Sequence, residues 1–133
     1  ATVAEQCKAP GPGKWSARDV VCHLVDTERL IFRPRMEALL REPEPYFPDI
    51  DHLPWVEANR YAEQEPAAKL REFLEERRRT VELVRSATDA QRQARGTHEI
   101  RGPISFTDGV EYCASHTRTH ANQIRRALAA ARQ

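Results

Sequence analysis

Apolar residues recur every three or four positions along three stretches of the chain, a spacing that places them on one face of an α-helix. The first stretch runs from Ser16 to about Arg41. Ser16 is its predicted N-cap, and Asp19 falls in the first turn, where a helix end is electropositive. Pro34 should kink this helix or split it, because proline lacks the backbone N–H. The predicted buried face contains Val20, Leu24, Thr27, Ile31 and Leu39.

A second helix is predicted to begin near Pro66, because proline suits the first turn of a helix. Three consecutive arginines, Arg77 to Arg79, lie on it and would suit a nucleic acid if taken alone. They follow Glu75 and Glu76 directly, so a solvated face with neutralised charge is the favoured interpretation. The predicted buried face contains Leu70, Phe73, Leu74, Val81 and Val84.

The last helix is predicted to run from about Ser105 or Thr107 to Ala131. Its apolar positions continue without a break, and two histidines fall on or beside this face. The predicted buried face contains Phe106, Val110, Cys113, Thr117, His120, Ile124 and Ala127.

The segments between these helices carry the residues of loops. Arg41 to Pro54 contains four prolines, and Gln91 to Pro103 ends in a Gly-Pro pair, so both are predicted to be loops. Trp55 to Tyr61 is long enough for a short helix. The three residues Glu99 to Arg101 alternate in polarity, but the run is too short to predict a strand.

Three substantial helices without a convincing strand predict an all-α protein, a helical bundle formed by a single domain that spans residues 1–133. Hydrophobic residues make up 40% of the 133 residues, which is enough for one core. Three wide apolar faces do not cover one another fully. A fourth helix or a partner chain is therefore expected to complete the core.

Composition argues against a nucleic-acid or membrane partner. Lys plus Arg is 21 and Asp plus Glu is 20, which gives a net charge of +1. No apolar run approaches the roughly 18 residues that a membrane span needs. No export signal opens the chain, so Cys7, Cys22 and Cys113 are expected to be free thiols of a cytoplasmic protein.

Three histidines occupy positions from which they could share a metal ion. His116 and His120 are four residues apart and project from one face of the last helix, and His23 lies on the inner face of the first. Three neutral imidazoles leave a coordination position free for water, which is the layout of a catalytic zinc site. A metal in such a site lowers the pKa of water enough to make it a nucleophile at neutral pH. Packing or surface histidines remain the alternative, because the HxxxH spacing alone is a weak signal.

Other polar residues near these histidines have two interpretations each. Asp26 and Glu28 could each orient a histidine or act on a metal-bound water. Alternatively, they are helix-surface carboxylates paired with Arg29 or Arg33, and this surface role is favoured for Asp26. Glu28 is the predicted proton-handling residue. Cys113 is either a fourth ligand or a packed thiol, and we favour the packed thiol. Gln123 is either a hydrogen-bonding partner of the site or an ordinary polar residue. His52 and His98 are expected to be exposed or hydrogen-bonded locally.

These motifs together resemble the DinB/YfiT-like superfamily. Gly13-Lys14-Trp15-Ser16 followed by His23-Leu24 and Asp26-Thr27-Glu28 is similar to the opening of that family's second helix. Glu65 to Phe73 resembles its third helix. Gly102-Pro103-Ile104-Ser105 and the later His116-xxx-His120-xx-Gln123-Ile124 resemble its last. The resemblance extends from about Pro10 to Leu128.

The resemblance implies an antiparallel four-helix bundle that holds a divalent metal, namely nickel, zinc, iron or manganese, through His23, His116 and His120. It also implies a small-molecule substrate and a homodimer. Some members of the family resemble metal-dependent hydrolases, and others are transferases or isomerases that use low-molecular-weight thiols such as mycothiol or bacillithiol.

Two features depart from the family pattern. The family's first helix is short or absent here, since only about nine residues precede Pro10. Thr117 to Thr119 also replaces a stretch that often carries an acidic residue and a further histidine. The leading hypothesis is a DinB-like metal-dependent hydrolase or thiol-dependent transferase. The alternative is a non-catalytic, dimerising or stress-related helical module with vestigial histidines.

Overall fold

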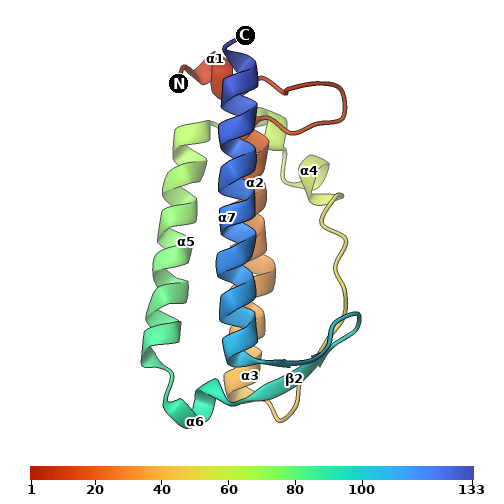
Figure 1. Ribbon diagram of the computed structural model, residues 1–133, viewed down its shortest axis with the longest axis vertical. Helices are drawn as coiled ribbons and strands as arrows, with labels where there is room; N and C mark the ends of the chain where they lie inside the picture. The colour runs from red at the N-terminus through yellow and green to blue at the C-terminus, as the bar shows by residue number, and fades with distance from the viewer.

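The computed structural model describes residues 1–133 and contains three long helical segments that pack side by side, with a small sheet at one end (Figure 1). The first segment comprises α2 (Ala17–Thr27), η1 (Glu28–Phe32) and α3 (Arg33–Arg41). The other two are α5 (Pro66–Ser86) and α7 (Phe106–Ala131). These helices are not long and apolar enough to cross a membrane. The short elements are α1 (Val3–Gln6), β1 (Tyr46–Phe47), α4 (Trp55–Ala58), η2 (Tyr61–Glu63), α6 (Asp89–Arg92), β2 (Arg95–His98) and β3 (Gly102–Ser105).

Side-chain caps fix where the long helices begin. The Ser16 hydroxyl accepts a hydrogen bond from the N–H of Asp19, whose carboxylate accepts one from the N–H of Ser16. Ser105 and Asp108 form the same reciprocal pair at the start of α7. The predicted N-cap Ser16 is therefore confirmed, and α7 begins within the predicted interval.

The first long helix changes its winding immediately before Pro34. Residues Glu28–Phe32 form a π-helical turn, and the N–H of Arg33 bonds the carbonyl of Glu28, five residues earlier. Pro34 then lies in the first turn of α3, a position at which a helix tolerates proline. The predicted interruption is thus a wider turn in a continuous helical path.

The two predicted loops contain a small sheet. Tyr46–Phe47 pairs in parallel with Thr97–His98, and Arg95–His98 pairs antiparallel with Gly102–Ser105. The prediction that both segments are entirely loop was wrong, because the strands are very short and one pairing joins residues about fifty positions apart. The sheet adds to the helical bundle without replacing its core. One core cluster is formed by Phe32, Met36, Leu39, Phe47, Ala87, Phe106 and Cys113.

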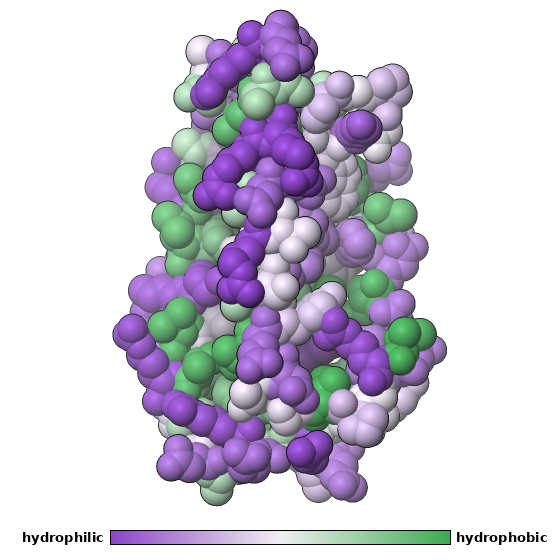
Figure 2. Space-filling view, viewed as in Figure 1, coloured by the Kyte–Doolittle hydropathy of each residue, from purple (hydrophilic) through white to green (hydrophobic).

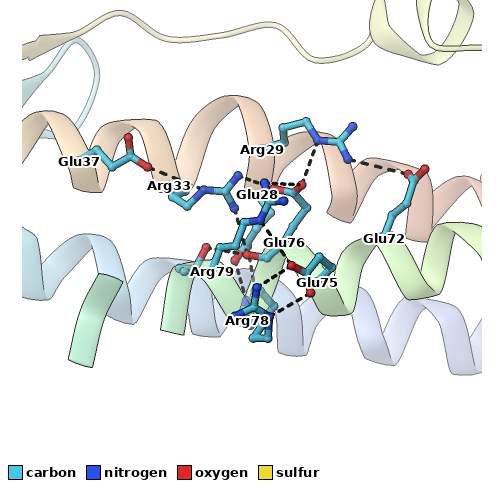
Figure 3. A network of polar contacts seen from close by, with 11 residues as sticks. Glu28, Arg29, Arg33, Glu37, Glu72, Glu75, Glu76, Arg78 and Arg79 are labelled. Carbon is cyan, nitrogen blue, oxygen red and sulfur yellow. Dashed lines mark hydrogen bonds and ion pairs between the residues drawn. The ribbon is translucent and has the colours of Figure 1, made fainter. Parts of the chain in front are cut away.

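The inner face of α5 differs from the predicted one. Phe73 is buried as predicted, but Leu70, Leu74 and Val81 are exposed. Figure 2 shows apolar patches over α5 between hydrophilic residues. Glu76 and Thr80 are buried instead, because arginines from the first long helix reach across to α5. Arg29 and Arg33 both bind the Glu76 carboxylate in the ionic network of Figure 3.

Candidate metal centre

Three imidazoles converge between α2 and α7. His23 Nε2 lies 3.3 Å from His116 Nε2, and His116 Nε2 lies 3.1 Å from His120 Nε2. One nitrogen from each of the three rings lies within 4.8 Å of the others. His116 and His120 meet because they are one turn apart on α7, and the packing of α2 against α7 brings His23 to them. The predicted histidine cluster therefore forms in the structure.

Hydrogen bonding orients these rings. The side-chain oxygen of Gln123 lies 2.7 Å from His120 Nδ1 and accepts a hydrogen bond from its N–H, which leaves the Nε2 lone pair of His120 free. The Nδ1 atoms of His23 and His116 are buried without a partner. Three Nε2 atoms this close together would bring their lone pairs against one another unless they share a proton or a cation.

The spacing of the three nitrogens fits one divalent ion. Imidazole nitrogens that ligate zinc at about 2.0–2.1 Å in tetrahedral geometry lie about 3.3 Å from one another. The two contacts of 3.3 and 3.1 Å match this separation. Three nitrogen donors without a fourth protein ligand leave a position open, as catalytic sites require.

Burial keeps these imidazoles neutral. Burial and the neighbouring His120 lower the pKa of His23 to about 3. Burial lowers the pKa of His116 to about 4, with His120 adding to the effect and Glu28 opposing it. Burial also lowers the pKa of His120, against the effect of its bond to Gln123. All three rings are therefore neutral at neutral pH, with one nitrogen of each free of a proton, which is the state in which imidazole ligates a metal.

Trp15 and His52 cover the cluster, and the sequence did not indicate that either would lie against His23. The ring of His52 lies 4.6 Å from that of His23, and the ring of Trp15 lies 4.9 Å from it. His52 had been interpreted as exposed or bonded locally, but it is half-buried against the cluster. Its segment lacks a regular period, so no sequence signal placed it there.

A cavity of about 350 Å³ adjoins the cluster, a volume suited to a small molecule. His23, His52 and His116 line it, and so does an apolar wall that includes Phe32 and Met36. Further residues of its lining are Arg35, Asp49, His98, Arg101 and Tyr112.

Glu28 lies in the core beside the cluster, paired with an arginine from α5. Arg77 Nε donates to Glu28 Oε2 at 2.7 Å, and Arg77 Nη2 donates to Glu28 Oε1 at 3.1 Å. Arg77 Nη2 also donates to the Thr117 hydroxyl at 2.6 Å. Glu28 is therefore a buried carboxylate, and Arg77 turns inward, away from the solvated face predicted for its run of arginines.

Asp26 was assigned to the helix surface, and this interpretation was wrong. Asp26 is buried and accepts hydrogen bonds from the Tyr61 hydroxyl at 2.7 Å and from Asn59 Nδ2 at 3.1 Å. It thereby ties the segment after α4 to α2, three residues from His23. Arg29 and Arg33, its expected partners, bind Glu76.

Cys113 packs in the core, as favoured from the sequence, and its thiol donates to Glu28 Oε1 at 3.5 Å. Burial raises the pKa of Cys113 to about 12, so the thiolate form needed for metal ligation is disfavoured. Burial likewise raises the pKa of Cys22 to about 12. The group of side chains that could hold a metal ion is therefore the three imidazoles of His23, His116 and His120, without a cysteine.

Comparison with known proteins identifies a family and a similar fold. A family model described as the DinB superfamily matches residues 1–124. The solved structure of YfiT from Bacillus subtilis, described as a probable metal-dependent hydrolase with an unusual four-helix bundle topology, matches with a TM-score of 0.84. The match has 23% sequence identity and covers 96% of this chain and 73% of YfiT, so it establishes a four-helix-bundle fold. A comparison with curated protein sequences gives no match.

Proposed function

The chain belongs to the DinB superfamily, and from this membership and the converging imidazoles we propose that it is a metal-dependent hydrolase of a small molecule. His23, His116 and His120 hold the divalent ion. The observation that carries the proposal is the triangle of Nε2 atoms, with neighbouring contacts of 3.3 and 3.1 Å, at the wall of a cavity. The description of YfiT as a probable metal-dependent hydrolase is consistent with it.

The residues around the triangle prepare it for an ion and a substrate. When bound, a divalent ion supplies Lewis acidity, which polarises a carbonyl or phosphoryl group and lowers the pKa of water. Gln123 fixes the tautomer of His120. Trp15 and His52 pack on the ring of His23 and limit its rotation. The apolar wall of the cavity excludes bulk water from the reacting bond.

Glu28 stays our predicted proton-handling residue. It lies close enough to His116 to oppose the lowering of that residue's pKa. Arg77 donates a hydrogen bond to each carboxylate oxygen, which fixes the orientation of the Glu28 side chain. A low-molecular-weight thiol as co-substrate, a homodimer and a cytoplasmic location also stay predictions from the family resemblance.

Elemental analysis of the purified protein tests the proposal. We expect about one divalent ion per chain in the unaltered protein and its loss in His120→Ala. His98→Ala is the matched control, because it removes an imidazole from the same cavity but not from the triangle, and it should retain the metal. Equal metal content in the unaltered protein and His120→Ala would favour the non-catalytic helical module.

Hydrolytic activity is then measured on panels of ester and amide substrates. We expect turnover that disappears on chelation, returns when the ion is restored and is absent in His120→Ala. A metal-loaded protein without turnover on any such substrate would overturn the assignment as a hydrolase while leaving the metal site intact.

A further inference from the structure

The cavity beside the histidine triangle carries a second set of polar side chains that the proposed metal site does not use. Arg35 and Arg101 line it, and His98 lies with them. Arg35 follows His23 by twelve residues on a continuous helical path, a rise of about 18 Å along the axis. The backbone of Arg35 is therefore distant from His23 along the helix. Arg35, Arg101 and His98 lie near one another, because, beyond the effect of burial, the charge of Arg101 lowers the pKa of Arg35 and both arginines lower that of His98.

The two guanidinium groups lack carboxylate partners. Most arginines of the first long helix and α5 form ion pairs with glutamates. Neither Arg35 nor Arg101 forms an ion pair with any carboxylate. Arg35 Nη2 donates to the carbonyl of Pro48 at 2.7 Å, and its guanidinium lies over the ring of Phe47. The guanidinium carbon of Arg101 lies 3.3 Å from the ring centroid of Tyr112.

Arg35 is half-buried beside the guanidinium of the exposed Arg101, a position that is unfavourable for its positive charge without an anion. Burial lowers the pKa of Arg35, and the charge of Arg101 adds to the lowering, whereas Asp49 and Tyr112 oppose it. Asp49 is an exposed side chain that forms no ion pair with either arginine. The other acidic residue of the lining, Asp108, accepts the N–H of Ser105 at the start of α7.

His98 supplies a third donor in a fixed tautomer. Its Nδ1 accepts hydrogen bonds from the N–H groups of Ile100 and Arg101 at 3.0 and 3.2 Å, so Nδ1 carries no proton. Burial lowers the pKa of His98, and its neutral ring must then carry the proton on Nε2. The nearest carboxylate oxygen, that of Asp49, is 3.8 Å away, beyond a hydrogen bond. The Nε2–H of His98 is thus a free donor in a side chain that is almost fully buried.

We propose that Arg35, Arg101 and His98 form an oxyanion subsite, so that the substrate carries a carboxylate or phosphate group at one end and its reacting bond at the other. This inference rests on the proposed function. Tyr112 lies between the proposed subsite and the histidine triangle. The Arg101 guanidinium stacks on its ring, and the ring lies 6.1 Å from that of His116. Phe32, 5.0 Å from the His116 ring, provides the apolar wall between them. An anionic small molecule with an apolar middle fits this lining.

Calorimetric titration with succinate and with inorganic phosphate tests the subsite, with succinamide as the uncharged analogue. The titrations use both metal-free and metal-loaded protein. We expect at least one oxyanion to bind in both states and succinamide not to bind. The tighter of the two oxyanions distinguishes a carboxylate-bearing substrate from a phosphate-bearing one, and either result supports the subsite.

Substitutions assign the binding to the proposed residues. Arg35→Gln and Arg101→Gln should each weaken oxyanion binding by about tenfold to a hundredfold while metal content stays unchanged. Arg126→Gln is the control, because Arg126 is an exposed arginine of α7 that does not line the cavity. Binding confined to metal-loaded protein, binding unchanged in both cavity variants or no binding in either state would overturn the subsite. Loss of metal in His120→Ala with oxyanion binding retained would separate the two proposals.

Discussion

Glu28 and Arg77 form a two-point ion pair in the core, with nitrogen–oxygen distances of 2.7 and 3.1 Å. Glu28 begins the π-helical turn, and Arg77 comes from the middle of α5. The pair therefore joins two of the three long helices beside the histidine triangle. A buried charge pair of this kind is more damaging to break than a surface pair, because the remaining carboxylate stays out of water.

We predict that Arg77→Met lowers the free energy of unfolding by about 3 kcal/mol, because it leaves the buried carboxyl group of Glu28 without its partner. Urea unfolding at neutral pH measures the change. Arg78→Met is the matched control, since Arg78 pairs with Glu75 and Glu82 at the surface and should leave stability nearly unchanged. Similar losses in both variants would contradict the view that Arg77 acts through burial of its partner.

The Tyr61 hydroxyl is predicted to stabilise the fold through Asp26. Tyr61→Phe should lower the free energy of unfolding by about 1–3 kcal/mol, because buried Asp26 then keeps only its bond to Asn59. Thermal and urea unfolding report the effect. Tyr46→Phe, which alters an exposed tyrosine, should have little effect. A Tyr61→Phe protein as stable as the parent would show that the hydroxyl contributes nothing.

The helices and the histidine triangle could be predicted from the sequence because both depend on local periodicity. Ser16 and Ser105 cap helices through residues three positions away. His116 and His120 share a face at any point of a regular helix. The approach of His23 to these two histidines depends also on which helices pack together. Its position on the inner face of its helix was sufficient to predict that approach.

The burial of Glu76 and the position of His52 could not be predicted from the sequence, because both depend on contacts between residues far apart in the chain. The inner face of α5 contains Glu76, whose burial is possible because Arg33 and Arg29 reach it from another helix. A pattern based on apolar residues alone therefore selected Leu70 and Leu74, which are exposed. His52 reaches the triangle through a proline-rich segment whose path is set by tertiary packing.

Gly96 is predicted to be indispensable for the pairing of β1 with β2. A Cβ at this position would lie 2.6 Å from the backbone carbonyl oxygen of Pro45, too close for any side chain. Gly96→Ala should therefore push the two strands apart and lower the midpoint of thermal unfolding. Gly109→Ala is the comparison, because nothing lies within 4 Å of its added Cβ and alanine favours a helix by about 0.5–1 kcal/mol. An unchanged or raised midpoint for Gly96→Ala would refute the prediction.

The metal-free protein is predicted to lose stability in mild acid. His23 and His116 have pKa values of about 3 and about 4 in the folded chain, against 6.5 for an ordinary histidine. As pH falls below 6.5, the unfolded chain takes up protons that the folded chain does not, so the free energy of unfolding decreases. Most carboxylates stay ionised in both states down to about pH 5, so the change between pH 6.5 and 5 reports chiefly the buried imidazoles.

Urea unfolding of metal-free protein at closely spaced pH values measures this dependence. His23→Gln should give a shallower decrease between pH 6.5 and 5, because it removes one of the imidazoles whose pKa is lowered. Arg126→Gln, at an exposed position of α7 away from the cluster, is the control, and its decrease should match that of the parent. A parent protein whose stability is constant over this interval would show that burial does not hold these rings neutral, and would remove the electrostatic basis for their readiness to bind a metal.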